Sequence, residues 1–341
     1  EGACFADIDG DGDQDVVSGP FWYEAPGFDN RSAYTEPLRF PISQYSRHFF
    51  SLAHDFDADD DPDILVIPMP GEAAHWFENP GPEAAAQARR WERHLAFPSV
   101  GNESPALTDL TGDGRPELVF CNQGAFGYAG PDPSDPTAEW KWTPVTDNRG
   151  LGRFTHGLGV ADIDGDGHPD LLETNGWWKN TAGERKHFLF HPFPFAAAGG
   201  AQMFAYDLDG DGDNDVVSSQ NAHAYGLSWF EQTRDGATIT FTKHDILTRD
   251  PNDNPYGVSI SQMHAVALAD IDGDGVSDIV TGKRFFAHGG RDPGAHELPV
   301  LYWFQTVRDG GAGKVSFVPW IIDDSSGVGP QLTVGDMNGD G

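Results

Sequence analysis

The chain has 341 residues, of which 42 are glycine, 25 are proline and 12% are aromatic. Its formal net charge is -33, and no basic cluster is present to meet phosphate groups, so the composition argues against a nucleic-acid partner. No stretch is long and apolar enough to cross a membrane as a helix. Because no long helical face is visible either, the composition favours a single all-β domain over residues 1–341.

An acidic motif recurs seven times, in copies that start near residues 7, 55, 109, 162, 207, 270 and 336. The fourth copy, ADIDGDGHPD, places carboxylates on alternate positions and glycines where the backbone must turn sharply. Hard oxygen ligands at this spacing are typical of a calcium loop. The predicted ligands of several structural Ca²⁺ ions are Asp7, Asp9, Asp11, Asp15, Asp55, Asp57, Asp59, Asp63, Asp162, Asp164, Asp166, Asp170, Asp207, Asp209, Asp211, Asp215, Asp270, Asp272, Asp274 and Asp278.

Apolar and aromatic segments around each loop predict an inner strand, a second apolar strand, an aromatic strand and an outer strand. In the first copy we expect strands at residues 1–5, 16–18, 21–24 and 48–50. In the second copy we expect strands at residues 64–67, 75–79 and 91–95, with a short helical patch at residues 83–90. Later aromatic strands are expected at residues 140–142, 177–180, 229–231 and 302–305, and later outer strands around residues 187–188, 244–246 and 320–322.

A repeat of roughly 50 residues with strand-like flanks is typical of a propeller built from four-stranded antiparallel blades. Histidines of the outer strands are expected to share one packing position: His48, His94, His187 and His244. The copy near residue 336 contributes only an inner strand. Six complete blades and an incomplete seventh are therefore predicted.

The DxDGDGxxD loops, each followed by a strand such as WFEN, resemble the FG-GAP/VCBS repeats of seven-bladed β-propellers, including integrin-type heads. This resemblance covers the whole chain. It implies a seven-bladed propeller with calcium-binding loops, and it leaves the activity open because propellers carry many functions.

A set of polar residues is predicted at the face opposite the acidic loops. His156 and His264 precede their loops by the same number of residues, as Glu103 precedes the third loop, and His223 lies in a connection that opens onto the same face. Three imidazoles with a carboxylate and an open position suit zinc or another first-row divalent ion. The competing interpretation is that these histidines bond backbone carbonyls around a water-filled channel.

A second resemblance is narrower. Segments FTHGLGVADIDGDG, SSQNAHAYGLSWFEQ, SQMHAVALADIDGDG and TGKRFFAHGGRDPGAHELPVLYWF are similar to the propeller domain of the aldos-2-ulose dehydratases. This resemblance implies a metal-dependent lyase that eliminates water from a keto sugar such as 1,5-anhydro-fructose or an aldos-2-ulose. The candidates for its acid and base are Glu103, Tyr225, Lys283 and His288.

Two other functions remain open. One is a non-catalytic, calcium-stabilised propeller that binds a glycan or a protein, and the other is a polysaccharide lyase. The first predicts calcium alone, whereas the dehydratase requires a transition metal as well. Calcium loops of this kind usually fill at extracellular calcium levels, so a secreted or periplasmic location is expected. The sequence does not indicate an oligomeric state.

Overall fold

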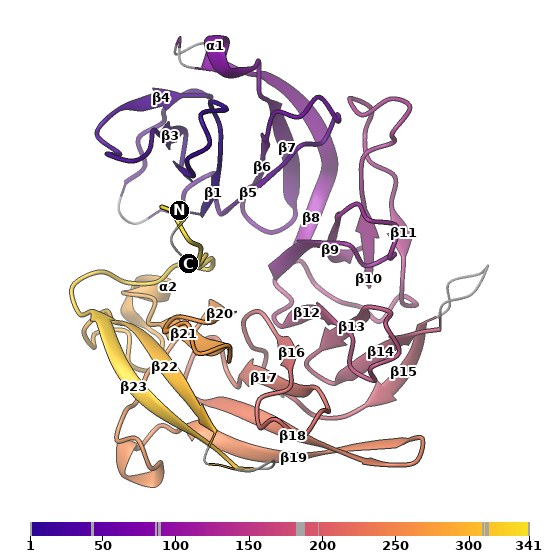
Figure 1. Ribbon diagram of the computed structural model, residues 1–341, viewed down its shortest axis with the longest axis vertical. Coiled ribbons are helices and arrows are strands. Elements are labelled where there is room, and N and C mark those ends of the chain that lie inside the picture. Colours follow the sequence, from indigo (N-terminus) through magenta and orange to yellow (C-terminus); the bar gives the residue numbers. More distant parts are fainter. Residues whose placement is uncertain are drawn as a thin grey trace. The chain divides into compact units, whose positions relative to one another are not determined.

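The computed structural model describes residues 2–41, 44–85, 87, 90–181, 188–196, 198–308, 310 and 314–339. Within these residues the protein is all-β, and its strands form antiparallel sheets whose neighbours mostly follow one another along the chain (Figure 1). The only helices in this part of the chain are α1 (Pro82–Ala85), α2 (Ala287–Gly290) and a 3-10 turn at Pro251–Asp253. Neither α-helix is long or apolar enough to cross a bilayer.

Four sheets have four strands each, which agrees with propeller-like blades. The first contains β1 (Ala3–Ala6), β2 (Asp15–Ser18), β3 (Phe21–Tyr23) and β4 (Arg31–Ala33). Another contains β12 (Leu158–Ala161), β13 (Asp170–Glu173), β14 (Gly176–Asn180) and β15 (Phe188–Pro192). The next contains β16 (Phe204–Tyr206), β17 (Asp215–Ser219), β18 (Leu227–Asp235) and β19 (Thr238–Leu247). The last contains β20 (Val266–Ala269), β21 (Asp278–Gly282), β22 (Leu301–Arg308) and β23 (Val315–Asp323).

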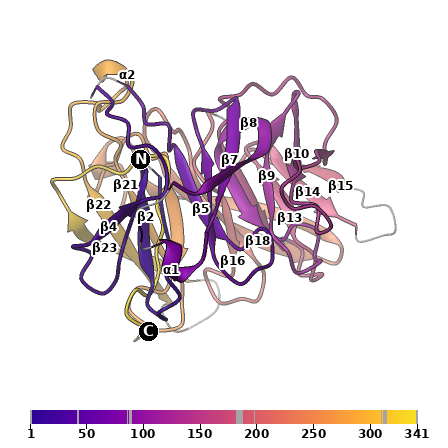
Figure 2. The ribbon, with the colours of Figure 1, turned by 90° about the horizontal axis from the view of Figure 1, so that it is seen from above.

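The remaining sheet has seven strands because one long strand replaces two short ones. Its members are β5 (Phe50–His54), β6 (Asp63–Ile67), β7 (Glu72–Glu78), β8 (Glu92–Thr108), β9 (Glu117–Asn122), β10 (Ala125–Ala129) and β11 (Thr143–Pro144). The first part of β8 pairs with β7, from Glu92 to Val100, as the outer strand of the second repeat (Figure 2). The same strand then continues to the third acidic loop without a break, so two predicted blades share one sheet.

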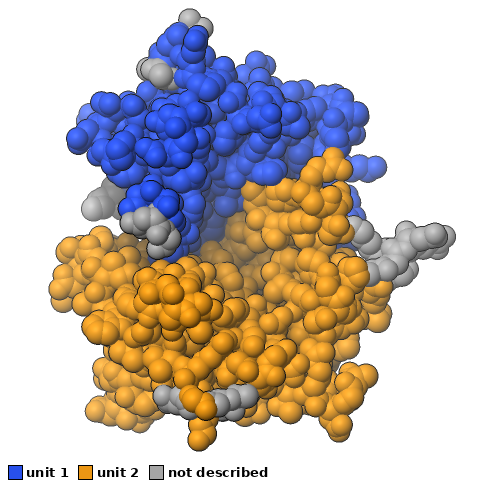
Figure 3. All heavy atoms as spheres, in the orientation of Figure 1, with its two compact units in different colours: residues 1–101, 121–154, 330–341 blue, residues 102–120, 155–329 orange. Residues whose placement is uncertain are grey.

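The chain divides into two compact units, coloured separately in Figure 3. Unit 1 comprises residues 1–101, 121–154 and 330–341, and unit 2 comprises residues 102–120 and 155–329. Unit 2 contains the sheets from β12 to β23, together with part of β8 and of β9. The candidate site described below lies entirely within it.

The hydrophobic core of each unit lies between the sheets. In unit 1, Val17 and Trp22 of the first sheet pack with Ile64 and Phe77 of the next. In unit 2, the cluster that contains Leu172 and Trp177 also contains Val216 and Phe230 of the following sheet, and a second cluster joins the last two sheets. Successive sheets therefore bury their faces against each other, as the period-two alternation of apolar residues requires.

The acidic loops connect the first and second strands of a sheet, and a buried aspartate at the ninth position anchors each complete one. Oδ2 of Asp170 accepts the N–H of Ile163 at 2.9 Å, and Oδ1 accepts the N–H of Asn180 at 2.7 Å. Equivalent pairs of bonds form at Asp15, Asp63, Asp215 and Asp278. These carboxylates hold the loop against the third strand, which explains why the loops adopt one shape.

Side-chain amides join neighbouring sheets within each unit. Asn180 Nδ2 donates to the carbonyl of Leu110 at 3.4 Å, and Gln232 Nε2 donates to the carbonyl of Ile163 at 3.2 Å. In unit 1, Asn79 Nδ2 makes the same bond to the carbonyl of Ile8 at 2.9 Å. The repeat therefore specifies how one sheet follows another as well as the shape of each loop.

Several sequence-based expectations were wrong. The fourth strand of the first repeat is β4, and residues 48–50 instead lead into β5. The third repeat has its third strand at β10, and residues 140–142 lie outside any strand; a Cβ on Gly127 of β10 would lie 2.7 Å from the ring of Trp142. The prediction of a strand at residues 140–142 rested on their aromatic content. A tryptophan in a loop can, however, pack over a glycine of a neighbouring strand.

The prediction that four histidines share one position on the outer strands was only partly correct. His94 and His244 occupy the expected position, where the ring of His94 packs at a tilt against Trp76 and the ring of His244 stacks on Trp229. His191 holds the equivalent place on β15 opposite Trp177, and His48 lies outside a strand. His187 lies outside the described residues. The helical patch at residues 83–90 is shorter than expected, with α1 limited to Pro82–Ala85, while residues 86, 88 and 89 are not described.

Residues 324–339 contain no strand, so the inner strand predicted before residue 336 is not present there. Two residues of this segment, both in unit 1, nevertheless bond to inner strands of the same unit. The side chain of Gln331 donates to the carbonyl of Ser51 at 2.7 Å and accepts its N–H at 2.9 Å, and Thr333 Oγ1 donates to the carbonyl of Ala3 at 2.8 Å. Its backbone therefore lies along inner strands without completing a ladder.

Candidate functional site

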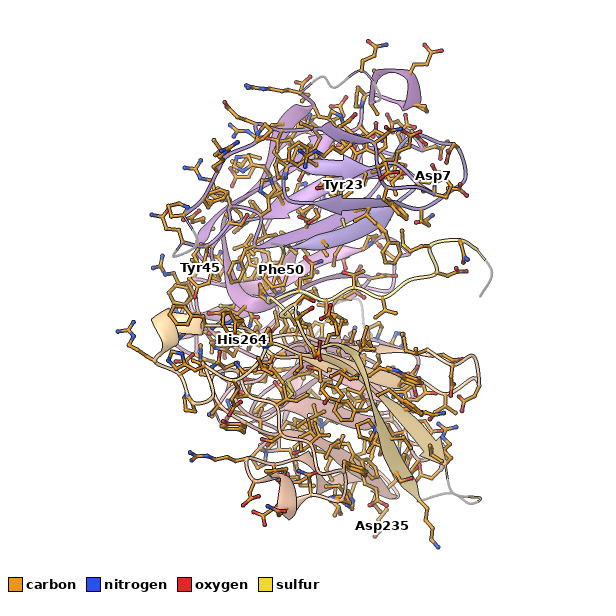
Figure 4. All side chains as sticks on the ribbon, turned by 90° about the vertical axis from the view of Figure 1, so that its left-hand side faces the viewer. Asp7, Tyr23, Tyr45, Phe50, Asp235 and His264 are labelled. Atoms are coloured by element: carbon orange, nitrogen blue, oxygen red, sulfur yellow. The ribbon has the colours of Figure 1, made fainter. Side chains whose placement is uncertain are left out.

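The starts of the inner strands in unit 2 bring the predicted histidines together. His156 comes two residues before β12 and His264 two residues before β20, whereas the acidic loops follow the other ends of these strands. His223 lies in the turn between β17 and β18, which opens to the same end of the antiparallel sheets. Figure 4 shows His264 towards the side of unit 2 that carries α2.

The three imidazoles form a compact cluster. The ring centroids of His156 and His223 are 4.9 Å apart, those of His223 and His264 are 4.8 Å apart, and those of His156 and His264 are 5.5 Å apart. One ring nitrogen from each residue lies within 4.8 Å of the others. Nε2 of His156 and Nε2 of His264 are buried and have no hydrogen-bond partner among the described residues.

Glu103 approaches the cluster from β8. Its Oε2 lies 3.4 Å from His156 Nε2 and 3.8 Å from His264 Nε2. Burial raises the pKa of this carboxyl, but the adjacent His156 and the charge of Arg284 outweigh burial and lower the pKa below its usual range. Glu103 is therefore ionised at neutral pH, and an anion faces the nitrogen cluster.

Burial lowers the pKa of His264 well below its usual value, and the neighbouring Arg284 and imidazoles act in the same direction. Burial also lowers the pKa of His223, against the opposing effect of Asp292. Both rings are therefore neutral at pH 7. A neutral imidazole is the form that can donate a lone pair to a metal ion.

Asp292 connects His223 to a fourth histidine. Its Oδ2 lies 3.2 Å from His223 Nδ1 and 2.9 Å from Nδ1 of His288, and the two rings are stacked with their centroids 4.7 Å apart. If each Nδ1 carries the proton donated to the carboxylate, each Nε2 is left with a lone pair. The carboxylate thus orients both rings so that Nε2 can act as a ligand or a base.

Tyr225 belongs to a second polar group beside this cluster. Its hydroxyl donates to Glu297 Oε1 at 2.7 Å, and Ser261 Oγ donates to Glu297 Oε2 at 3.3 Å. Burial raises the pKa of Tyr225, and the Glu297 carboxylate raises it further. The phenol is consequently a proton donor at neutral pH.

Lys283 differs from the other predicted acid–base residues because it is only 1% exposed. Its Nζ donates to the carbonyl of Arg284 at 3.3 Å, and burial lowers its pKa. The sequence made Lys283 a candidate acid or base. The structure places it beneath the surface, close enough to Glu297 for their charges to interact.

Strained backbone surrounds the site. Eight non-glycine residues of the described chain have positive φ, and half of them lie here: Asn102, Gln262, Phe286 and His288. Gln262 is fully buried; its N–H donates to the carbonyl of Ala224, and its Nε2 donates to the carbonyl of Pro293 at 3.0 Å. Such conformations persist where the surrounding contacts fix them, and they cluster at functional sites.

Two members of the site were missed in the sequence. Asp292 and Glu297 lie in the Gly- and Pro-containing connection between α2 and β22. Neither has a motif of its own. The available signal was the number of charged residues and histidines in a short stretch, RDPGAHEL, that follows the predicted His288.

The acidic loops also gather carboxylates. One oxygen from each of Asp7, Asp9 and Asp15 lies within 4.8 Å of the others, as does one from each of Asp55, Asp57 and Asp63. Asp11 and Asp59 accept backbone N–H bonds two residues ahead in their own loops. In the third copy, Glu117 replaces the ninth-position aspartate and accepts bonds from Leu110 and Thr111.

Comparison with known proteins supports the repeat and the fold class. An FG-GAP-like repeat model matches residues 207–281, a segment that includes the fifth and sixth acidic loops. No curated protein matches the chain.

Among solved structures, a lectin of Agrocybe aegerita, described as recognising non-reducing terminal N-acetylglucosamine, aligns with a TM-score of 0.53 and 19% identity over 95% of this chain and 85% of that one. The V. cholerae biofilm matrix protein Bap1 aligns with a TM-score of 0.39 and 15% identity, over 78% of this chain and 38% of that one. At this identity, the lectin's likeness concerns the fold alone.

Proposed function

We propose that this protein is a metal-dependent carbohydrate lyase, built on a seven-bladed β-propeller fold, that eliminates water from a keto sugar. The observation that carries the proposal is the convergence of His156, His223 and His264 with two buried ring nitrogens that lack hydrogen-bond partners among the described residues. An unpaired polar atom in a buried position is costly, and a bound cation would remove that cost.

The residues present fit a first-row divalent ion such as zinc. His156, His223 and His264 supply the nitrogen ligands and Glu103 is placed to supply an oxygen, while Asp292 orients His223 as a second-shell carboxylate does in many zinc sites. The ion, when bound, would supply Lewis acidity towards a carbonyl oxygen.

The side chains around the cluster supply the proton transfers. His288 is 43% exposed on its side chain, and its Nε2 is the lone-pair nitrogen when Nδ1 donates to Asp292. This nitrogen is suited to remove the proton from the carbon next to the ketone. The hydroxyl of Tyr225, with its raised pKa, is suited to protonate the leaving oxygen.

The atoms balance without a further reactant. The C–H bond beside the ketone breaks and its proton goes to His288, the C–O bond at the next carbon breaks, and a C=C bond forms between the two carbons. The leaving hydroxyl takes the Tyr225 proton and departs as water. Glu297 then accepts a hydrogen bond from the tyrosine once it is reprotonated.

We further propose that the acidic loops bind structural calcium and that the protein is secreted or periplasmic. The loops hold carboxylates together at the spacing that calcium requires, and extracellular calcium would offset part of the net charge of -33. Localisation of the full-length gene product to the cytosol would contradict this part of the proposal.

Elemental analysis of the purified protein tests the site. We expect about one zinc or similar ion per chain in addition to calcium, lost in the His156→Ala/His264→Ala variant and retained in His191→Ala, a histidine that stacks on Trp177 on another strand. The metal-loaded protein is then incubated with 1,5-anhydro-fructose, and enone formation is followed by ultraviolet absorbance. Calcium alone, unchanged by the double substitution, would overturn the lyase proposal.

Glycan binding without catalysis is the second candidate. The lectin with a similar fold binds a terminal sugar, and a cavity of about 660 Å³ in unit 1 is lined by Tyr45, His75 and Arg93 among others. An exposed ring beside polar groups suits a sugar. Binding of N-acetylglucosamine that persists in the His156→Ala/His264→Ala variant, without turnover of keto sugars by the parent protein, would favour this function.

A further inference from the structure

The fourth acidic loop differs from the others in the residue that faces it from the third strand. This position is defined by the ninth-position aspartate, whose Oδ1 accepts the N–H of the following residue in each sheet. It is occupied by an acid or an amide in four sheets and by a lysine in one: Glu24, Glu78, Glu231, Gln305 and Lys179. Among these five described positions, only that of the fourth loop therefore holds a basic residue.

The lysine reaches into the loop. Lys179 Nζ donates to Asp164 Oδ2 and, at 2.8 Å, to Asp166 Oδ2, which are the third- and fifth-position carboxylates. The side chains are partly buried, with exposures of 28% for Lys179 and 12% for Asp164. The ammonium thus binds two of the carboxylates that were predicted to be calcium ligands.

A second cation reinforces this arrangement. Arg234, from β18 of the next sheet, donates from Nη1 to the backbone carbonyl of Asp164 at 2.7 Å, and its Nε lies 2.9 Å from Asp213. The fourth loop therefore has two basic side chains on one of its aspartates. A divalent cation at the same place would meet positive charge from both.

The three loops that face a glutamate have a negative rather than a positive side chain at this position. Asp9, Asp57 and Asp209 hold the third position of their loops, and each has a buried carboxylate oxygen without a hydrogen-bond partner among the described residues. Glu24, Glu78 and Glu231 add negative charge that acts on these same aspartates. Among the described residues, no basic side chain bonds to these third-position carboxylates. In the fifth loop, Arg234 Nε lies 2.9 Å from Asp213, and Arg308 donates to the backbone carbonyls of Asp207 and Leu208, so both cations act at other positions of that loop. Asp164 also has one such oxygen, so the loops differ in the facing residue rather than in the aspartates.

We propose that the ammonium of Lys179 is the permanent cation of the fourth loop, which therefore does not bind calcium, while the loops that face Glu24, Glu78 and Glu231 do. A tethered ammonium neutralises the carboxylates at every calcium concentration and loses little entropy on pairing. This proposal departs from the sequence-based assignment of Asp162, Asp164, Asp166 and Asp170 as calcium ligands, and it excepts the fourth loop from the calcium binding proposed above for the acidic loops. It is independent of the function proposed for the histidine cluster.

The arrangement has a consequence for that cluster. The fourth loop follows β12, and His156 comes two residues before the start of the same strand. Because Lys179 pairs with the carboxylates of the fourth loop, this loop should keep its conformation when the calcium concentration falls. His156 would therefore keep its place under conditions that empty the other loops.

The test is the calcium content of the full chain after equilibration in excess calcium and desalting. Lys179→Glu recreates the residue found in the glutamate-facing loops, and we expect it to bind about one calcium ion more per chain than the parent. Lys179→Met removes the ammonium without adding a ligand and is also expected to gain calcium. The matched control is the converse change Glu78→Lys, which is expected to lose about one ion.

A second measurement keeps the test decisive if the lysine variants fold poorly. Asp164→Asn alters the fourth loop of the parent protein and is expected to leave the calcium content unchanged, whereas Asp57→Asn in the second loop is expected to lower it by about one ion. Loss of calcium in Asp164→Asn, or an unchanged calcium content in folded Lys179→Glu, would overturn the proposal.

Discussion

Tyr225 donates a hydrogen bond from its hydroxyl to Glu297 Oε1 at 2.7 Å, although the two residues are 72 positions apart. The bond joins the turn before β18 to the connection before β22, and the backbone of Tyr225 also bridges to Ser261. Three segments of unit 2 therefore meet at one phenol. The proposed acid is held by contacts between sheets rather than by its own strand.

Tyr225→Phe removes the proposed proton donor and keeps the ring. We expect the rate of keto-sugar elimination to fall by about 10²- to 10⁴-fold because protonation of the leaving oxygen is lost. The metal content should not change, since Tyr225 is not a ligand. Tyr302→Phe, on β22, is the control and should keep full activity; equal losses in both variants would contradict the role of Tyr225.

Asp292→Asn tests the orientation of the two histidines. An amide can still accept from one Nδ1, but it cannot serve two donors with a full negative charge, so the tautomer of His223 is no longer fixed. We expect metal affinity to weaken by about 10- to 100-fold. Competition with a chelator measures this change.

The exposed Asp253→Asn is the matched control for that measurement and should retain the parent's metal affinity. Conservative Asp292→Glu should recover part of the affinity, because a longer carboxylate can still face both rings. Unaltered metal affinity in Asp292→Asn would show that Asp292 serves only the loop that carries it.

Much of this site could be predicted from the sequence because the repeat fixes the register. Once the acidic loops mark the ends of the inner strands, residues at one distance before each loop must lie at one end of the sheets, and this rule brought Glu103, His156 and His264 together. His223 followed from the antiparallel order of the strands. Asp292 and Glu297 could not be found in this way, since they lie in a connection without a repeat.

The third repeat shows the limit of pattern reasoning for the fold. Its predicted aromatic strand around Trp140 is a loop. Trp140 is buried there nonetheless: its backbone N–H donates to the carbonyl of Ala96, and its ring contacts the ring of Phe56. A tryptophan signals burial, and burial does not require a strand. Lys179 shows the same limit in the fourth acidic loop: the motif specifies the shape of the loop but not the residue that faces it from the third strand.

The buried aspartates of the loops predict how stability depends on pH when calcium is removed. Burial raises the pKa of Asp63 to about 8 and those of Asp170 and Asp215 to about 7, although backbone N–H bonds oppose the shift. The folded protein therefore binds protons more tightly than the unfolded chain, whose carboxyls have the usual value of 3.8. Between about pH 4 and pH 8, stability should fall as pH rises, by on the order of 4 kcal/mol per carboxylate.

Thermal unfolding in a chelator at pH 5 and pH 8 measures this slope, and the lower melting temperature is expected at pH 8. Calcium favours the ionised carboxylates, so saturating calcium should flatten or reverse the slope. Asp63→Asn removes one titrating group and should reduce the slope in the chelator. A melting temperature that rises from pH 5 to pH 8 without calcium would contradict the prediction.

Gly159 lies in β12 where no side chain can fit. A Cβ at this position would be 2.1 Å from the carbonyl oxygen of Met203 and 3.1 Å from its Cβ. The two segments approach this closely because Met203 N donates to the carbonyl of Leu158 at 2.9 Å. Gly159→Ala must therefore push the inner strand of one sheet away from the segment that leads into the next.

We expect Gly159→Ala to destabilise the protein by about 1–3 kcal/mol, as overpacking does in other cores, and to weaken metal binding because His156 is three residues away on the displaced chain. Urea unfolding and chelator competition measure the two effects. Gly329→Ala is the control, since a Cβ there meets no atom within 4 Å. If Gly159→Ala lowered stability but left metal affinity intact, β12 would shift without moving His156, and the strand start would not be what positions the cluster.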